Sequence, residues 1–133
     1  MYTFTKDLET GNNLIDTEHR QLFQAINGLL EACNAGQGRA NVEKTVKFLM
    51  EYTAKHFADE EKLQQASKYP DYPNHYKIHE GFKKRVAEIG AELNAKGPSI
   101  ILVSKVNSDI GDWLINHIRT QDKKLAEHIK THS

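Results

Sequence analysis

Apolar residues recur three and four positions apart along most of the chain, which is the spacing of one face of an α-helix. The first stripe runs through Leu22, Phe23, Ile26, Leu29, Leu30 and Cys33. Three later stripes run through Val42, Val46, Leu49, Tyr52 and Leu63, then Ile78, Phe82, Val86, Ile89 and Leu93, then Leu102, Val103, Val106, Ile110, Trp113 and Leu114. No stretch competes with the alternation of a β-strand, so the pattern predicts an all-α chain.

Three short segments rich in glycine or proline separate these stripes, namely "NAGQGRAN" at 34–41, "SKYPDYPNH" at 67–75 and "KGPS" at 96–99. Such residues end helices, and Ser99 is suited to cap the helix that follows. The pattern therefore predicts helices at roughly 17–35, 41–66, 73–95 and 99–118. Four amphipathic helices with short connections favour an antiparallel up-and-down four-helix bundle, as a single domain over 1–133.

The two ends of the chain lie outside the four stripes. Residues 1–15 form an irregular N-terminal arm, whose apolar side chains we expect to pack on the bundle: Tyr2, Phe4, Leu8 and Leu14. Residues 122–131 form a short C-terminal helical tail. Its two histidines, His128 and His132, are predicted to be exposed to solvent.

Composition excludes several classes of partner. Lysine plus arginine number 18 and aspartate plus glutamate number 18, so no net charge attracts nucleic acid or an anionic membrane. The longest aliphatic run, at 100–103, is too short to span a bilayer, and the first residues lack the apolar core of a signal peptide. The only cysteine, Cys33, lies on an apolar stripe and indicates a buried thiol in a reducing compartment. We therefore expect a cytoplasmic protein.

Most of the seven histidines fall on the apolar stripes. Residues four apart share one face of a helix, so the pairs His56 with Glu60 and His75 with His79 can each aim two side chains at one point. His19 and His117 lie on the other two stripes. A single such residue is typical of a core histidine bonded to a backbone carbonyl. Five imidazoles and a carboxylate together indicate a metal site, because a buried unpaired carboxylate costs several kcal/mol.

A further acidic residue, Asp122, follows His117 by five positions. Five residues turn a regular helix by about 500°, which leaves the two side chains about 140° apart. They can share a site only if the helix breaks or bulges, and we predict a break at Arg119 to Gln121. Glu61, next to Glu60, is predicted on the solvated face.

The number of candidate ligands indicates two metals. Seven side chains exceed what one zinc takes, and imidazole with carboxylate suits iron or another transition metal better than calcium or magnesium. Two octahedral ions offer twelve positions, of which five imidazoles, two bridging carboxylates and one bridging oxygen fill eleven. The last position is open to a small exogenous ligand. Five histidines divide as three on one metal and two on the other.

Two other metal-site classes lack their motifs. Ferritin-like di-iron proteins need Glu-x-x-His pairs, and the chain contains none. Zinc proteases need His-Glu-x-x-His, but His79 and Glu80 are followed by Lys83 in place of the second histidine. A purely structural metal is disfavoured as well, because structural sites close all their positions.

In their order, four sequence motifs resemble the hemerythrin family, specifically a bacterial hemerythrin domain: "LIDTEHRQLF", "HFADE", "YPDYPNHYKIHEGF" and "WLINHIRTQD". The resemblance covers nearly the whole chain. It implies a non-heme di-iron centre with an oxo or hydroxo bridge that binds dioxygen reversibly. Phe4 departs from the family pattern, because many bacterial members have tryptophan in the arm. This difference bears on packing only.

The same resemblance assigns a role to each ligand. It implies that the coordinatively filled iron is held by His75, His79 and His117. It implies that the iron with the open position is held by His19 and His56. The two carboxylates that bridge the irons are then Glu60 and Asp122.

Two functions from different classes remain open at this point. In the first, the protein binds dioxygen for storage, delivery or sensing, alone or as a domain fused to a signalling protein. In the second, it is a di-iron enzyme acting on peroxide or nitric oxide at the same open position.

The residues that we expect to line the oxygen pocket are Leu22, Phe23, Tyr52, Thr53, Trp113 and Leu114. Most cannot deliver protons, which favours binding, and Tyr52 is the exception.

Overall fold

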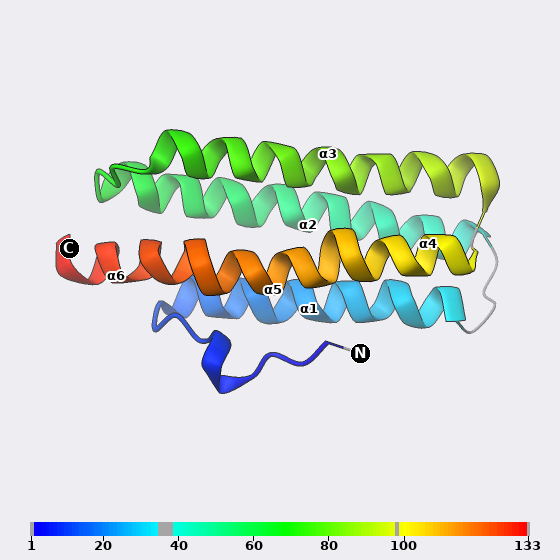
Figure 1. Cartoon of the computed structure of the whole chain (residues 1–133), viewed down its shortest axis with the longest axis horizontal. Coiled ribbons are helices and arrows are strands. Elements are labelled where there is room, and N and C mark those ends of the chain that lie inside the picture. Colours follow the sequence, from blue (N-terminus) through cyan, green and yellow to red (C-terminus); the bar gives the residue numbers. More distant parts are fainter. Residues whose placement is uncertain (1, 35–38, 98, 133) are drawn as a thin grey trace.

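The computed structural model describes residues 2–34, 39–97 and 99–132, and within these ranges the secondary structure is entirely helical. Three long helices come first: α1 (Asn13–Asn34), α2 (Arg39–Ala66) and α3 (Tyr72–Lys96). A fourth rod consists of α4 (Ile100–Lys105), α5 (Trp113–His117) and α6 (Lys123–His132), joined by π-helical segments at Val106–Asp112 and Ile118–Asp122. Figure 1 shows the four rods side by side. The predicted all-α four-helix bundle is confirmed.

The N-terminal arm is shorter than predicted, because α1 begins at Asn13 and not at residue 17. The Asp16 carboxylate fixes the turn into this helix by accepting hydrogen bonds from the backbone N–H of Thr10 at 2.8 Å and of Gly11 at 3.2 Å. Gly11 has a φ of +89°, a conformation that favours glycine. The prediction that Leu14 packs on the bundle was wrong: it is 44% exposed, because the early start of α1 turns it outward.

Apart from the end of the fourth helix, the other helix boundaries lie within two residues of those predicted from the glycine and proline positions. Ser99 caps α4, and its side chain accepts a hydrogen bond from the N–H of Leu102 at 3.1 Å. Part of the predicted glycine-rich break, residues 35–38, and Pro98 of "KGPS" lie outside the described residues. Among those that are described, no helix is both long enough and apolar enough to cross a membrane.

The fourth rod is continuous, so the predicted end at residue 118 was wrong. The irregularity predicted at Arg119 to Gln121 is present, but as a π-turn and not as a break. The helix widens at Ile118–Asp122, where one turn contains an extra residue. The N–H of Lys123 therefore bonds to the carbonyl of Ile118, five residues earlier. Backbone angles at both ends of the segment stay in the right-handed α region. A π-turn keeps the backbone helical and hydrogen-bonded across the segment, whereas a break would leave several backbone groups unpaired. The residues predicted as a separate tail continue this rod as α6.

The core divides the bundle into two halves. The half around the C-terminal part of α1 is filled by aliphatic side chains, each less than 5% exposed: Ile26, Leu29, Val42, Val46, Leu49, Val86, Ile89, Leu93, Leu102 and Val106. Burial of such a side chain is worth roughly 1.5–3 kcal/mol. The opposite half, where α1 begins and α2 ends, holds most of the buried polar residues. The aliphatic half therefore supplies stability that the polar half cannot.

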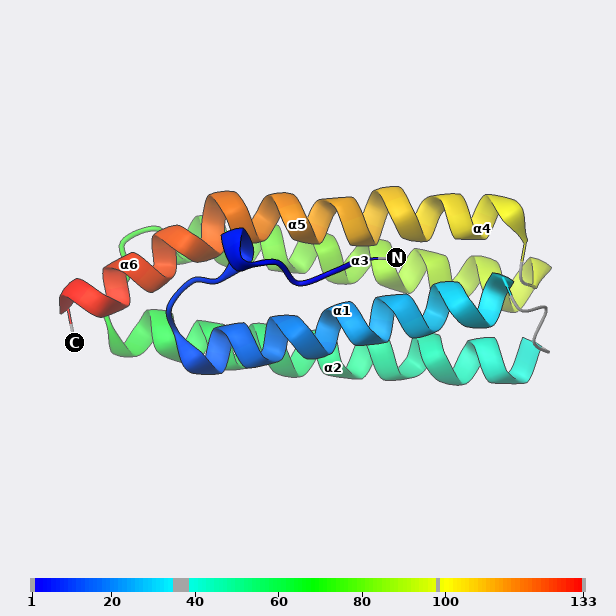
Figure 2. The ribbon, with the colours of Figure 1, turned by 90° about the horizontal axis from the view of Figure 1, so that it is seen from below.

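The arm lies along the bundle between α1 and the fourth rod, as Figure 2 shows. Its first described residue, Tyr2, exchanges two hydrogen bonds with the side chain of Asn27 at 2.8 and 2.7 Å. The Tyr2 hydroxyl donates to the carbonyl of Asn107 at 2.9 Å. The ring lies against Gly111, where an added Cβ would be 2.1 Å from Tyr2 Cζ. The π-helical segment thus provides a notch that only glycine leaves open.

Replacing Gly111 with alanine should destabilise the protein by about 1–3 kcal/mol, because the rigid Tyr2 ring must leave its place. Gly81→Ala is the matched control: this exposed glycine of α3 has no atom within 4 Å of an added Cβ. Alanine there should stabilise the helix by up to about 1 kcal/mol. Urea unfolding followed by helical circular dichroism measures both, and a neutral Gly111→Ala variant would contradict the described fit.

Candidate metal centre

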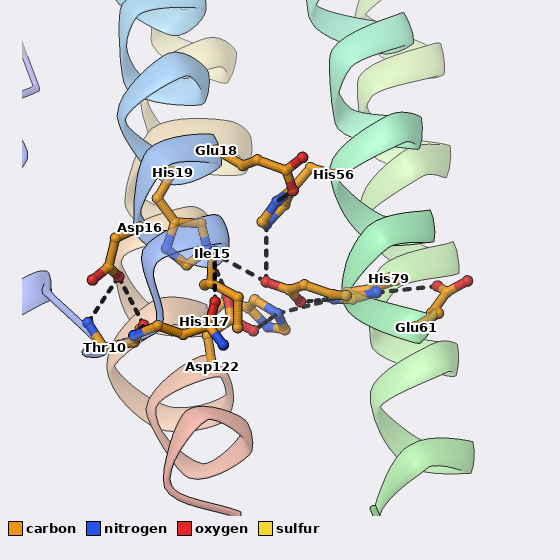
Figure 3. Close-up of polar contacts among 12 residues, drawn as sticks. Thr10, Ile15, Asp16, Glu18, His19, His56, Glu61, His79, His117 and Asp122 are labelled. Atoms are coloured by element: carbon orange, nitrogen blue, oxygen red, sulfur yellow. Dashed lines mark hydrogen bonds and ion pairs between the residues drawn. The ribbon is translucent and has the colours of Figure 1, made fainter. Parts of the chain in front are cut away.

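Seven polar side chains meet in the buried polar half of the bundle. They are His19 from α1, His56 and Glu60 from α2, His75 and His79 from α3, His117 from α5, and Asp122 from the second π-helical segment. His117 is 3% exposed and the other six are 0% exposed. Figure 3 shows His19, His56, His79, His117 and Asp122 of this set directed toward a common centre. Every residue that the sequence proposed as a metal ligand is therefore in one cluster.

Local helix geometry explains how the pairs are aimed. His56 and Glu60 are one turn apart, and His56 Nε2 lies 2.9 Å from Glu60 Oε2. The π-turn at Ile118–Asp122 brings the fifth residue to the position that the fourth would occupy in a regular helix. As a result, Asp122 Oδ1 lies 3.1 Å from His117 Nε2.

The cluster contains two overlapping groups of donor atoms, each within 4.8 Å. The first consists of Glu60, His75, His79, His117 and Asp122. The second consists of His19, His56, Glu60 and Asp122. Three histidines thus lie on one side and two on the other, and the same two carboxylates belong to both groups. This is the arrangement that two metals with shared bridging carboxylates require.

The spacing of the donor atoms fits coordination. His117 Nε2 lies 3.2 Å from His75 Nε2 and 3.3 Å from His79 Nε2. A ligand distance of about 2.1 Å places neighbouring octahedral ligands about 3.0 Å apart. Both distances from His117 are therefore close to those expected between neighbouring ligands of one metal.

The shared carboxylates carry lone pairs that no hydrogen bond satisfies. Both oxygens of Glu60 and both of Asp122 are buried and lack a hydrogen-bond partner, as does Nε2 of His19 and of His56. Several of these atoms are nevertheless only 2.9–3.5 Å from one another. The donors are thus close together without the angles of hydrogen bonds, which is expected when they aim at a common third atom. The residues present fit a metal pair.

The pKa values of the cluster residues indicate that protons occupy the positions that a metal would take. Burial acts to lower the pKa of His56, but Glu60 and Glu18 outweigh it and raise the pKa to about 10. For His75, Asp122 and Glu60 likewise overcome burial and raise the pKa to about 9. Burial acts to raise the pKa of Glu60, yet His56 and the other imidazoles hold it well below its usual range. Protons therefore occupy the site without metal, and metal binding releases them.

Comparison with known proteins agrees with this geometry. Residues 10–129 match the family described as "Hemerythrin HHE cation binding domain". The chain belongs to the hemerythrin family. It is 36% identical to a bacteriohemerythrin of Stenotrophomonas maltophilia, over 95% of this chain and 80% of the relative. It is 34% identical to a myohemerythrin of Sipunculus nudus, over 92% of this chain and 89% of the relative.

The fold also matches a solved structure. The crystal structure of a point-mutant protein superposes on the chain with a TM-score of 0.85, covering 97% of this chain and 96% of that one. The two sequences are 23% identical, so this match supports the bundle fold and no finer assignment.

Two carboxylates outside the cluster orient histidines of this hemerythrin-family site, and the sequence analysis missed both roles. His56 Nδ1 donates to Glu18 Oε1 at 2.9 Å, and His79 Nδ1 donates to Glu61 Oε2 at 3.2 Å. The prediction that Glu61 is solvated was wrong: its side chain is 17% exposed, because it faces α3. Such partners fix the ring orientation and raise the basicity of a metal ligand. Glu18 had a sequence signal, since it lies on a stripe with Ile15 and Leu22.

The predicted pocket residues divide into two groups. Leu22, Phe23, Thr53 and Leu114 are each 3% exposed or less, and Trp113 stacks on the His117 ring at 4.6 Å. Tyr52 packs against the same core cluster but reaches the surface. It is half-buried, with its ring stacked on exposed Phe48 at 6.0 Å and the Lys55 ammonium 5.9 Å away.

Three other predictions concern side chains away from the cluster. His128 was predicted to be solvated, but it is half-buried and its Nε2 donates to the carbonyl of Ser67 at 2.8 Å. The fourth rod extends far enough to reach the loop after α2, which accounts for this contact. His132 is exposed as predicted. Cys33 is half-buried, and burial raises the pKa of its thiol.

The metal-free protein should lose stability as the pH rises from about 7 to 10. His56 and His75 have folded-state pKa values of about 10 and about 9, above the ordinary 6.5. The folded chain therefore holds protons that the unfolded chain has released. This stabilisation is complete below pH 6.5 and disappears as the pH passes the folded values. Thermal unfolding in chelator measures the decline.

Two variants and the loaded protein test the cause of that decline. His75→Gln should flatten it, whereas the exposed His132→Gln should leave it unchanged. Protein loaded with metal should decline less over the same window, because metal has replaced the protons. A metal-free stability that is constant or rises between pH 7 and 10 would contradict the assigned shifts.

Proposed function

We propose that this chain binds dioxygen reversibly at a non-heme di-iron centre, in the cytoplasm, for storage, delivery or sensing. One observation carries the proposal: two buried donor groups, unequal in histidine number, share the same two carboxylates. Members of the hemerythrin family are oxygen-binding proteins and not enzymes, which supports the same reading. Unequal groups leave one metal position without a protein ligand, and a small molecule can bind there.

Each cluster residue has a role in this proposal. His75, His79 and His117 hold the filled iron, and His19 and His56 hold the iron with the open position. Glu60 and Asp122, which belong to both donor groups, would be shared by the two irons. When bound, the iron pair supplies the open position and the electrons that dioxygen takes up. Glu18 and Glu61 keep the rings of His56 and His79 in the orientation that this arrangement needs.

The surroundings of the two-histidine side favour reversible binding. The Phe4 ring of the arm lies 6.4 Å from the His19 ring and packs on Phe23, and Leu22 and Leu114 are buried in the same hydrophobic cluster as Phe23. These side chains exclude water and donate no protons. A ligand that receives no proton can leave unchanged, so apolar walls support binding over turnover.

The alternative function, a di-iron enzyme acting on peroxide or nitric oxide, depended on a proton donor at the pocket. Tyr52 was the candidate, and its ring contacts lie with Phe48 and Lys55 at the bundle surface. Burial and the nearby Glu18 charge raise the pKa of the Tyr52 hydroxyl. A phenol in this position is a poor acid for the site, so the contacts favour the binding proposal.

Purified protein from iron-rich medium should contain two irons per chain. Glu60→Ala should remove most of the iron, because each iron loses a shared ligand. Glu51→Ala is the matched control on the same helix; Glu51 is exposed, and its loss should leave full iron and a stability within about 0.5 kcal/mol. Metal analysis after aerobic growth measures all three proteins. One zinc and no iron in the wild type would refute the di-iron proposal.

Leu114→Ala should shorten the lifetime of the optical band that air induces in the reduced, iron-loaded protein. The smaller side chain opens the apolar wall to water, so the iron pair is lost to an inactive ferric form faster. Leu102→Ala is the matched control, because Leu102 is equally buried but lies in the aliphatic half of the bundle. Both variants should lose about 2–5 kcal/mol of stability. If the two lifetimes shorten equally, Leu114 has no special role in the wall.

A further inference from the structure

An exposed lysine is connected to one of the cluster histidines through a single buried carboxylate. Lys55 Nζ lies 2.9 Å from Glu18 Oε2, and the other oxygen of that carboxylate accepts the Nδ1–H of His56 at 2.9 Å. The Lys55 side chain is 60% exposed and the Glu18 side chain only 4%. Figure 3 shows Glu18 directed at the His56 ring. A solvent-exposed cation thus acts on a buried ligand through two short contacts.

We propose that Lys55 is a positioning residue that raises the reduction potential of the iron held by His56. The inference rests on the proposed di-iron function and concerns the regulation of that same site. A carboxylate that accepts the Nδ1–H of an imidazole makes the ring a stronger donor, which stabilises ferric iron. The positive charge of Lys55 partly offsets the negative charge of Glu18. The carboxylate then accepts the His56 hydrogen bond less strongly, and the imidazole becomes a weaker donor to the iron. Ferrous iron, the form that takes up dioxygen, is favoured as a result.

The other oriented histidine lacks this arrangement. His79 donates to Glu61 at 3.2 Å, and among the described residues no lysine or arginine lies within ion-pair distance of Glu61. The carboxylate behind the two-histidine side is therefore paired with a lysine, whereas the one behind the three-histidine side is not. This difference makes the iron with the open position the more easily reduced of the two.

Lys55 is held in place by two further contacts. Asp59, one turn later on α2, lies 2.9 Å from Lys55 Nζ. The Tyr52 ring, one turn earlier, lies 5.9 Å from the same nitrogen. The ammonium group is therefore fixed over Glu18 from both sides, and a side chain without a charge cannot replace it.

Lys55→Met tests the proposal, because methionine keeps an unbranched apolar stem and removes the charge. The midpoint potential is measured in iron-loaded protein under nitrogen, where one electron passes from a reduced dye mediator to the ferric pair. We expect a lower potential in Lys55→Met, by threefold to tenfold in the one-electron equilibrium, or about 30–60 mV. The Lys55→Arg variant keeps the positive charge, so its midpoint potential should equal that of the wild type. Lys47→Met, which removes an exposed charge from the same helix, should not change it.

A second substitution tests whether the effect passes through Glu18. In a Glu18→Gln background the carboxylate is gone, so adding Lys55→Met should change the potential no further. An equal change in both backgrounds would mean that Lys55 acts directly through space, and it would overturn the proposal. A potential unchanged in Lys55→Met would overturn it as well, whatever the stability of the variant.

A measurement without iron separates this inference from the proposed function. In metal-free protein at fixed pH, the Nδ1–H proton resonance of His56 should move downfield in Lys55→Met, because the unpaired carboxylate accepts the hydrogen bond more strongly. It should stay in place in Lys47→Met. An unmoved resonance in Lys55→Met would overturn the proposal even if the wild type binds two irons. Failure of the wild type to bind iron would refute the proposed function alone, with the resonance still testing the contact chain.

Discussion

The whole architecture depends on keeping two carboxylates, Glu60 and Asp122, side by side in a dry interior. Two like charges without solvent repel strongly, and burial alone would raise the pKa of both. His56, His19 and His75 hold the pKa of Glu60 down in the metal-free chain, and His117 and His19 do the same for Asp122. Metal ions satisfy the same lone pairs better, because each donor then gains a partner. The cluster is therefore built for cations, whether protons or metals occupy it.

This constraint accounts for the division of the bundle. A core half filled with carboxylates and imidazoles contributes little apolar burial, so the aliphatic half must hold the helices together. It also accounts for the irregular fourth rod. A regular helix cannot aim His117 and Asp122 at one point, and a broken helix would leave backbone groups unpaired in the interior. The π-turn meets both requirements with one extra residue in one turn.

The residues behind the ligands give the site its asymmetry. Three histidines face two across the shared carboxylates, which leaves one side short of a protein ligand. The outer carboxylates follow the same division, because Glu18 is paired with Lys55, whereas the only ion-pair partner of Glu61 among the described residues is His79. Apolar walls and the Phe4 ring cover the side with fewer ligands. The side with two histidines thus differs from the side with three in its number of ligands, in the charge next to its outer carboxylate and in its apolar covering.

The sequence by itself determined the four helices and the seven side chains of the cluster, because both depend on periodicity within single helices. Spacing of three and four fixes which way a side chain points around its own axis, and His56 with Glu60 is the simplest case. The five-residue interval between His117 and Asp122 required an irregularity, but its form as a π-turn was a tertiary outcome. Glu61 and His128 were misplaced for a related reason. Their surroundings depend on how far a neighbouring helix reaches and how closely it approaches, as does the fit of Tyr2 against Gly111. Those quantities are properties of packing between helices, which no pattern along one helix encodes.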